Sequence, residues 1–367
     1  MTPDPGLASW LQLSLTPGLG AATIRSLLKQ FGLPQAMLAR RDGELAPLVG
    51  QSALQALRSP RVAEAVERAL QWAAADDHHV ITLADETYPR GLLEISDPPP
   101  VLFAHGRLEV LTRPAIAIVG SRNASAQGTR NAEQFAAALG DAGLTIVSGL
   151  ALGIDAAAHR GGLASRSSTI AVLGTGIDVV YPARNAELAA EIAQRGLLLS
   201  EFPLGASAIA HNFPRRNRLI SGLARGCLVV EAAVESGSLI TARCAADQGR
   251  DVFAIPGSIH SPLSKGCHAL IKAGAKLVES AEDVLAELAG FRASGFANAA
   301  ASATAGEPDT GVLAVMGHDP VDVDSLCVRA GLSAEQVASE LLRLELDGRV
   351  TALPGGLYQR LEKAQRG

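Results

Sequence analysis

A short segment at positions 120–122 combines two small residues with an arginine, directly after an apolar run. The run covers 115–119, and Gly120, Ser121 and Arg122 follow it. Where a strand passes into a helix, small residues let backbone N–H groups approach an anion, and an arginine adds a bidentate contact to a phosphate. The same residues also suit an ordinary turn with a solvated arginine. Taken alone, the segment leaves both interpretations open.

The densest basic segment of the chain is Phe213-Pro214-Arg215-Arg216-Asn217-Arg218. Three arginines beside an aromatic ring match the needs of an unpaired nucleic-acid strand, because cations follow the phosphates while a base stacks on the ring. A solvated turn is the alternative, but the adjoining phenylalanine is unlike a simple run of charge. The segment therefore favours a contact with a single strand.

Two later loops carry small polar or basic residues after apolar runs. Ser236, Gly237 and Ser238 follow the run at 227–230, and Lys265 follows the run at 252–255. Hydroxyl and backbone N–H groups at the start of a helix donate to phosphate oxygens, and a lysine contributes a point charge. Equally, either serine could cap the next helix and the lysine could be solvated. Neither interpretation is decided by these residues alone.

A glycine-rich loop at 148–155 contains Gly149, which permits close backbone approach, and ends at Asp155. On a helix Asp155 and His159 face the same way, so they could form an acid–base couple. Such a pair is more often a cap and a structural partner, and no serine or cysteine nucleophile is obviously paired with it. We therefore predict no catalytic residue, no cofactor and no enzyme activity.

The elements that would position these loops alternate between apolar runs and helical spacing. The runs lie at 115–119, 144–147, 169–173, 197–200, 227–230 and 252–255. Continuous apolar strands with helical intervals indicate an α/β fold, a Rossmann-like and mostly parallel sheet with helices on both faces. In such sheets ligands bind at the carboxyl ends of the strands. The small polar loops fall at these ends.

Composition divides the chain into four parts. We predict an N-terminal helical domain and connector over 1–113, the Rossmann-like domain over 114–290 and a flexible linker over 291–309, which is rich in Ala, Ser and Gly. Residues 310–367 read as a winged helix, with a capping box at Ser333 and Gln336 followed by a hairpin.

Charge is unevenly distributed along this acidic chain, whose formal net charge is −5. Residues 205–276 hold nine Lys and Arg against four Asp and Glu, whereas residues 277–367 hold seven against 14. A local basic surface on an acidic protein can hold a phosphate backbone.

The ends and the cysteines indicate a cytosolic protein. The N-terminus has no basic region followed by an apolar run, and no stretch approaches 18 uncharged apolar residues. The four cysteines are well separated and form no C-x-x-C pair, so they indicate neither a metal site nor a disulfide framework. We expect reduced thiols, no secretory signal, no membrane span and a cytoplasmic location.

In order and spacing, these motifs together resemble the DNA-processing protein A family, also called DprA or Smf. The matching stretches cover about 170 residues, in chain order 118–122, 148–155 with His159, 169–174, 176–178, 181–182, 200–203, 213–218, Glu231 with 236–241, and 256–258. The N-terminal segment at 16–32 resembles a helix–hairpin–helix. In this family the N-terminal helical region is often described as SAM-like.

The resemblance implies binding of incoming single-stranded DNA during natural transformation, its protection, and loading of the RecA recombinase. It implies a homodimer through the Rossmann-like domain, with 268–271 facing the partner. It also implies DNA-binding residues, which are Gly120, Ser121, Arg122, Gly149, Phe213, Arg215, Asn217, Arg218, Ser236, Gly237, Ser238 and Lys265.

Two other classes of function compete with this interpretation. A nucleotide-binding hydrolase resembling phosphoribohydrolases would use a Pro-Gly-Gly-x-Gly-Thr loop, but the comparable segment at 235–241 lacks the double glycine. A transcription regulator would need basic residues on the helix at 333–347, which instead carries Arg343 against four acidic side chains.

Overall fold

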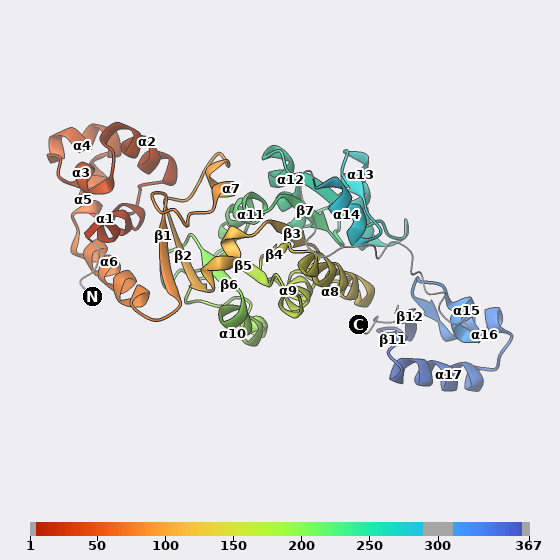
Figure 1. The fold of residues 1–367 in the computed structure, drawn as a ribbon. Coiled ribbons are helices and arrows are strands. Elements are labelled where there is room, and N and C mark those ends of the chain that lie inside the picture. The colour runs from red at the N-terminus through yellow and green to blue at the C-terminus, as the bar shows by residue number, and fades with distance from the viewer. Residues whose placement is uncertain (1–4, 289–310, 362–367) are drawn as a thin grey trace.

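Nine strands form one sheet in the middle part of the chain (Figure 1), and their spatial order is β1-β2-β6-β5-β4-β3-β7-β8-β9. The computed structural model describes residues 5–288 and 311–361. Strands β3 to β9 are mutually parallel. They are β3 (Ala115–Val119), β4 (Thr145–Ser148), β5 (Thr169–Val172), β6 (Leu197–Ser200), β7 (Gly226–Val229), β8 (Asp251–Ala254) and β9 (Lys276–Leu277). The predicted mostly parallel sheet is confirmed, and each of the six predicted runs forms a strand within one residue of its expected bounds.

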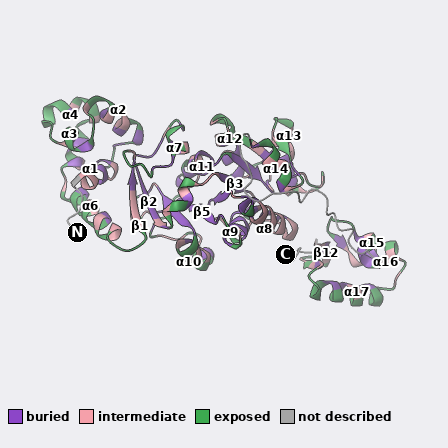
Figure 2. Ribbon diagram, in the orientation of Figure 1, coloured by how far each residue is buried: buried purple, intermediate pink, exposed green. Residues whose placement is uncertain are grey.

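Helices cover both faces of this sheet, as its continuous apolar strands require. Side chains alternate across β3, so Ile116 and Ile118 pack against α8 (Ala126–Asp141), α9 (Ile154–Ala164) and α14 (Ala281–Glu287). Ala117 and Val119 join the opposite cluster with α11 (Asn212–Leu223), α12 (Ser238–Asp247) and α13 (Lys265–Lys272). Helix α10 (Ala186–Arg195) packs against β5 and β6. Strands β3 to β7 are accordingly buried along their whole length (Figure 2), whereas the edge strand β9 is exposed.

The sheet extends into the region that the sequence predicted to be helical. Strand β1 (His78–Thr82) pairs antiparallel with β2 (Val101–Gly106), and β2 pairs antiparallel with β6. The expected domain boundary at residue 113 therefore falls between strands of one sheet. Both strands are short, and the segment between them holds the helix α7 (Arg90–Leu93) and a run of three prolines. Strand β2 is held in the sheet by its pairing with β6, about a hundred residues later, and β1 pairs in turn with β2.

Within the described residues, six helices precede the sheet. They are α1 (Pro5–Ser14), α2 (Ala21–Phe31), α3 (Pro34–Leu38), α4 (Asp42–Val49), α5 (Gln51–Leu57) and α6 (Pro60–Ala73). Most of their buried side chains form a separate core around Ile24, Leu27 and Met37. Trp10 and Leu11 instead join Phe103 of β2 in one cluster. The helical domain is therefore anchored on the edge of the sheet.

The C-terminal part builds its own small core from three helices and a three-stranded sheet. Its elements are α15 (Val312–Met316), β10 (Val321–Asp322), α16 (Val323–Ala330), α17 (Ala334–Leu346), β11 (Val350–Leu353) and β12 (Leu357–Arg360). The predicted capping box opens α17, because Ser333 and Gln336 cap each other's backbone N–H groups. This is the predicted winged helix.

The predicted linker at 291–309 lies outside the described residues. Within the described residues, no helix is both long and apolar enough to cross a bilayer.

Candidate functional site

A cavity of about 690 Å³ opens at the carboxyl ends of β3 and β7, and we call it the carboxyl-edge cavity. Loops that are distant in the sequence converge there because the parallel strands end at one edge. Eight of the twelve predicted DNA-binding residues line it, namely Gly120, Ser121, Arg122, Phe213, Asn217, Ser236, Gly237 and Ser238. The other four, Gly149, Arg215, Arg218 and Lys265, do not line it.

Helix α11 explains which of its arginines reach the cavity. Phe213, Arg216, Asn217 and Ile220 line the cavity, and their spacing of three and four residues is one helix face. The basic segment is therefore a helix rather than the solvated turn considered from the sequence. Arg216 was not among the predicted residues, although counting three and four positions from Phe213 leads to it.

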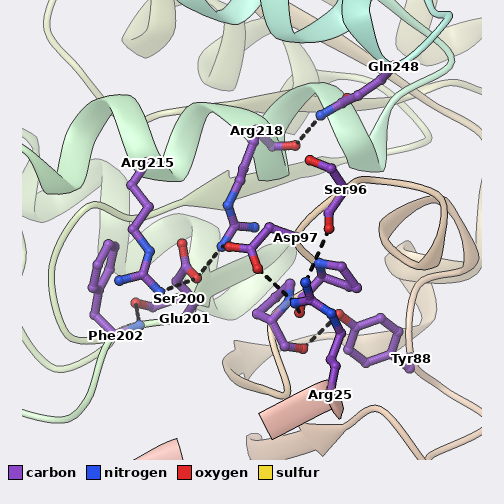
Figure 3. Close-up of polar contacts among 12 residues, drawn as sticks. Arg25, Tyr88, Ser96, Asp97, Ser200, Glu201, Phe202, Arg215, Arg218 and Gln248 are labelled. Carbon is purple, nitrogen blue, oxygen red and sulfur yellow. Dashed lines mark hydrogen bonds and ion pairs between the residues drawn. The ribbon is translucent and has the colours of Figure 1, made fainter. Parts of the chain in front are cut away.

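Arg215 and Arg218 lie on the other face of α11, where they enter a chain of ion pairs (Figure 3). The Glu201 carboxylate, only 2% exposed, lies 3.1 Å from Arg215 and 2.5 Å from Arg218. Asp97 continues the chain, 3.6 Å from Arg218 and 2.7 Å from Arg25 of α2. Neither arginine lines the cavity, because carboxylates on the far side of the helix hold them, and a contact of these two arginines with DNA stays a prediction.

Arg216 forms the charged floor of the cavity and is 4% exposed. Its guanidinium donates to the carbonyl oxygen of Gly149 at 2.6 Å and to that of Val172. Burial lowers the pKa of Arg216 to about 10, against the attraction of Asp155, so the side chain stays cationic at neutral pH. A buried, hydrogen-bonded cation of this kind is pre-organised to receive an anion.

The close approach of Arg216 depends on glycine at position 149. A Cβ built there would lie 2.4 Å from a guanidinium nitrogen of Arg216. Gly149 thus lies beneath the cavity and leaves space for the charge above it. Lys265 is directed elsewhere, since its exposed ammonium donates to the carbonyl oxygen of Ile259.

Aromatic rings and a second guanidinium lie at the mouth of the cavity. The Phe213 ring centroid lies 5.5 Å from that of Tyr181, whose side chain is 47% exposed. The exposed Arg122 guanidinium lies 5.8 Å from the Phe213 centroid, within cation–π range. Tyr181 also lines the cavity, and the sequence reasoning did not single it out as a binding residue. These groups together offer stacking faces beside positive charge.

The loop between β4 and α9 is held in a strained conformation beside the cavity. Leu150 has a φ of 58°, a left-handed value that costs a non-glycine residue free energy. The backbone N–H of Leu150 donates to Nε2 of His159, and the Asn185 side chain donates to the Leu150 carbonyl oxygen at 2.8 Å. These partners fix the loop, and with it the position of the Gly149 carbonyl group.

Asp155 and His159 act on this loop separately. Asp155 accepts from the backbone N–H groups of Gly149 and Ala151, and burial raises its pKa while Arg216 opposes that shift. His159 is fully buried between Leu150 and Thr169, and burial lowers its pKa to about 3. This geometry agrees with the structural role that the sequence favoured for the pair.

Serine hydroxyls complete one wall of the cavity. Ser236 and Ser238 are 2.7 Å apart at the start of α12, and the backbone N–H of Ser238 donates to the Ser236 hydroxyl. Ser121 is tied to the neighbouring strand, since its backbone N–H donates to the carbonyl oxygen of Glu231 at 2.7 Å. The cavity thus combines hydroxyl groups, guanidinium groups and aromatic rings, which can bind phosphates and bases.

Comparison with known proteins identifies a family for the whole arrangement. Residues 79–289 match the family model described as DNA recombination-mediator protein A, and residues 296–356 match the DprA winged helix domain. Protein Smf of Escherichia coli is 44% identical over 309 residues, 82% of each chain. DNA processing protein DprA of Streptococcus pneumoniae is 52% identical over 206 residues, 56% of this chain and 73% of its own.

Solved structures agree with these sequence relatives. An X-ray structure of DNA processing protein A from Streptococcus pneumoniae matches with a TM-score of 0.65 and 41% identity, over 78% of this chain and 99% of its own. DNA processing protein A from Helicobacter pylori, a structure described for its single-stranded DNA binding mode, matches with a TM-score of 0.52 and 30% identity. It covers 56% of this chain and 94% of its own. The sheet domain and the winged helix each match a DprA model, and the chain therefore belongs to the DNA recombination-mediator protein A family.

Proposed function

We propose that this protein is a DNA-processing protein that binds single-stranded DNA in the carboxyl-edge cavity and has no enzymatic activity. The observation that carries the proposal is the meeting of two guanidinium groups with an aromatic pair. Arg122 and Arg216 supply positive charge, and Phe213 and Tyr181 supply ring faces in the same cavity. Phosphates follow the charge while an unpaired base stacks on a ring, which a base inside a duplex cannot do.

The relatives support the ligand class. The Helicobacter pylori structure is described for a single-stranded DNA binding mode, and two matching relatives are named DNA processing proteins. The excess of basic residues in 205–276 favours phosphate binding in this part of the chain, even though the whole chain is acidic.

Fluorescence anisotropy tests this proposal directly. Labelled single-stranded oligonucleotides are titrated with the full chain at two salt concentrations, with duplex DNA as competitor. We expect salt-dependent binding that prefers the single strand. No binding, or equal binding of duplex and single strand, would contradict the proposal.

Nucleotide hydrolysis is the second candidate, and the presence of carboxylates in the same cavity is the observation that favours it. Asp155 and Glu235 both line the cavity. Asp155 already accepts two backbone hydrogen bonds, which leaves it poorly placed to activate a water molecule. Incubation with nucleoside monophosphates, followed by chromatography of the free base, decides between the two, and we expect no free base to be released.

The wider role follows the family resemblance. We propose that the protein acts in the cytoplasm as a homodimer through its Rossmann-like domain, protects incoming DNA in natural transformation, and helps load RecA onto it. Helix α13 contains the segment expected to face the partner subunit, and its Ala269 is exposed. Mass photometry tests the dimer, and a RecA strand-exchange assay on protein-coated DNA tests the loading.

A further inference from the structure

A second large cavity, of about 780 Å³, opens at the opposite edge of the same sheet. Its lining includes residues next to the amino ends of β3, β7 and β8, together with α7 and the segment before it. We call it the amino-edge groove. The strands of four to five residues span roughly 15 Å, so the groove and the carboxyl-edge cavity are separate sites on one domain.

Arginines line the amino-edge groove in a row that the topology creates. Arg113, Arg225 and Arg250 each come one or two residues before a strand, and those strands are the neighbours β3, β7 and β8. Adjacent strands in a sheet lie about 4.8 Å apart, so the parallel pairing places the three residues side by side. Arg90 at the start of α7 adds a fourth positive charge.

Not all of this charge is neutralised within the described residues. Arg250 pairs with Glu94 at 2.5 Å, and Arg113 donates to the carbonyl oxygens of Arg166 and Ser167. Arg90 and Arg225 are exposed, and neither side chain has a partner among the described residues. The groove also contains Glu86 and Asp251, both exposed at its surface.

The Arg250 side chain has a further unused donor. It is 20% exposed, and its Nε is buried without a hydrogen-bond acceptor in the described structure. A buried donor left unpaired is costly, so an acceptor arriving with a ligand would be favoured there. Glycines keep this region closely packed, since a Cβ on Gly91 would lie 2.3 Å from the Gly222 carbonyl oxygen.

We propose that the amino-edge groove is a second phosphate-binding site, and that its ligand is the backbone of a nucleic-acid strand long enough to pass both edges of the sheet. The row of arginines provides charge at regular intervals, whereas the groove's described lining has one aromatic ring, that of the buried Tyr88. Such a site holds phosphates without reading or stacking bases. The choice of ligand rests on the proposed function.

The test compares short and long single strands on the full chain. A strand of about six nucleotides fills one site, while a longer one engages both. We expect Arg90→Ala/Arg225→Ala to weaken binding of the long strand about tenfold and to reduce its salt slope by about 1.4, because two phosphate contacts are lost. Binding of the short strand should not change. The matched control is Arg61→Ala/Arg243→Ala, which removes two exposed charges outside both cavities.

Hydrogen exchange separates this proposal from the proposed function. We expect tripolyphosphate and the long strand each to protect 222–226 and 249–251, even if the short strand fails to bind and the proposed function is wrong. Protection by tripolyphosphate alone would overturn the nucleic-acid ligand. The site would be overturned if Arg90→Ala/Arg225→Ala bound the long strand as tightly as the parent protein does and neither probe protected these segments from exchange.

Discussion

At the scale of single residues, the two arginines of the carboxyl-edge cavity differ in burial and therefore in role. Arg216 is buried and already hydrogen-bonded, so it serves as a fixed positive floor. Arg122 is exposed, and its guanidinium lies over the Phe213 ring with no hydrogen bond or ion pair to the described residues, so it is free to contact a phosphate. The exposed residue is the better target for mutation, since we expect its loss to leave the fold undisturbed.

We predict that Arg122→Ala weakens single-strand binding and lowers the slope of log affinity against log salt by about 0.7, the value for one phosphate contact on a single strand. Anisotropy titrations over a range of salt measure both quantities. Arg243→Ala removes an exposed arginine of α12 that does not line the cavity and should leave both unchanged. An unchanged slope in Arg122→Ala would remove this residue from the site.

We predict a different signature for the ring. Phe213→Leu should cost about 1–3 kcal/mol of binding free energy without changing the salt slope, because it removes a stacking face and no charge. Phe213→Tyr keeps the ring and should bind nearly as the parent does. A fall in the salt slope of Phe213→Leu would show that the ring instead acts by positioning Arg122.

At the scale of elements, α9 and α11 hold the cavity from two sides. Helix α11 uses one face for the cavity and the other for the ion pairs that lead through Asp97 to Arg25 of the helical domain (Figure 3). Helix α9 carries Asp155 and His159, which fix the strained loop beneath Arg216. Stability measurements can isolate this second contribution.

The buried His159 should make stability depend on pH. Its pKa is lowered to about 3 by burial, then by Arg216 and Arg160, against 6.5 for an unperturbed histidine. Between these values the unfolded chain binds more protons, so this histidine lowers the free energy of unfolding as pH falls from about 6.5 toward 3. The contribution is about 1.4 kcal/mol for each pH unit.

We predict that His159→Gln is folded at pH 7.5, because its side-chain oxygen can accept from Leu150. It should lose less stability than the parent between pH 6 and pH 4.5, as measured by urea denaturation at each pH. If both proteins lost the same free energy of unfolding, protonation of His159 would not be the main cause of the pH dependence between pH 6 and pH 4.5.

At the scale of the whole molecule, the winged helix has a surface unlike that of the sheet domain. Leu342 and Leu346 of α17 are 59% and 82% exposed and are accompanied by several acidic side chains. A negative surface repels phosphates, whereas exposed leucines suit a protein contact. We therefore expect the principal DNA site to lie in the sheet domain.

We predict that a chain ending at Asp309 binds short single strands within about threefold of the parent, because every residue of the carboxyl-edge cavity remains. Anisotropy gives the comparison, and circular dichroism checks that the truncated chain is folded. A loss of binding in a folded truncated protein would place the main site on the winged helix.

The sequence by itself determined the parallel sheet, because each apolar run is a complete strand whose character depends on neighbouring residues. It also determined which loops meet, since parallel strands end at one edge. Six of the eight predicted residues that line the cavity follow β3 or β7, whereas Phe213 and Asn217 lie on α11. The winged helix was also predictable from neighbouring residues, since the capping box at Ser333 marks the start of its helix α17.

Only the tertiary structure decided what depends on partners distant in the chain. Strand β2 joins the sheet by pairing with the distant β6, and β1 is added to it through β2. Arg215 and Arg218 are turned from the cavity by Glu201 and Asp97. The Arg216 side chain can reach the cavity only because Gly149, 67 positions earlier in the chain, has no Cβ to block its guanidinium. Adjacent arginines of one motif look equivalent in sequence, and the rotation of a helix against its neighbours is what separates the buried charge from the paired ones.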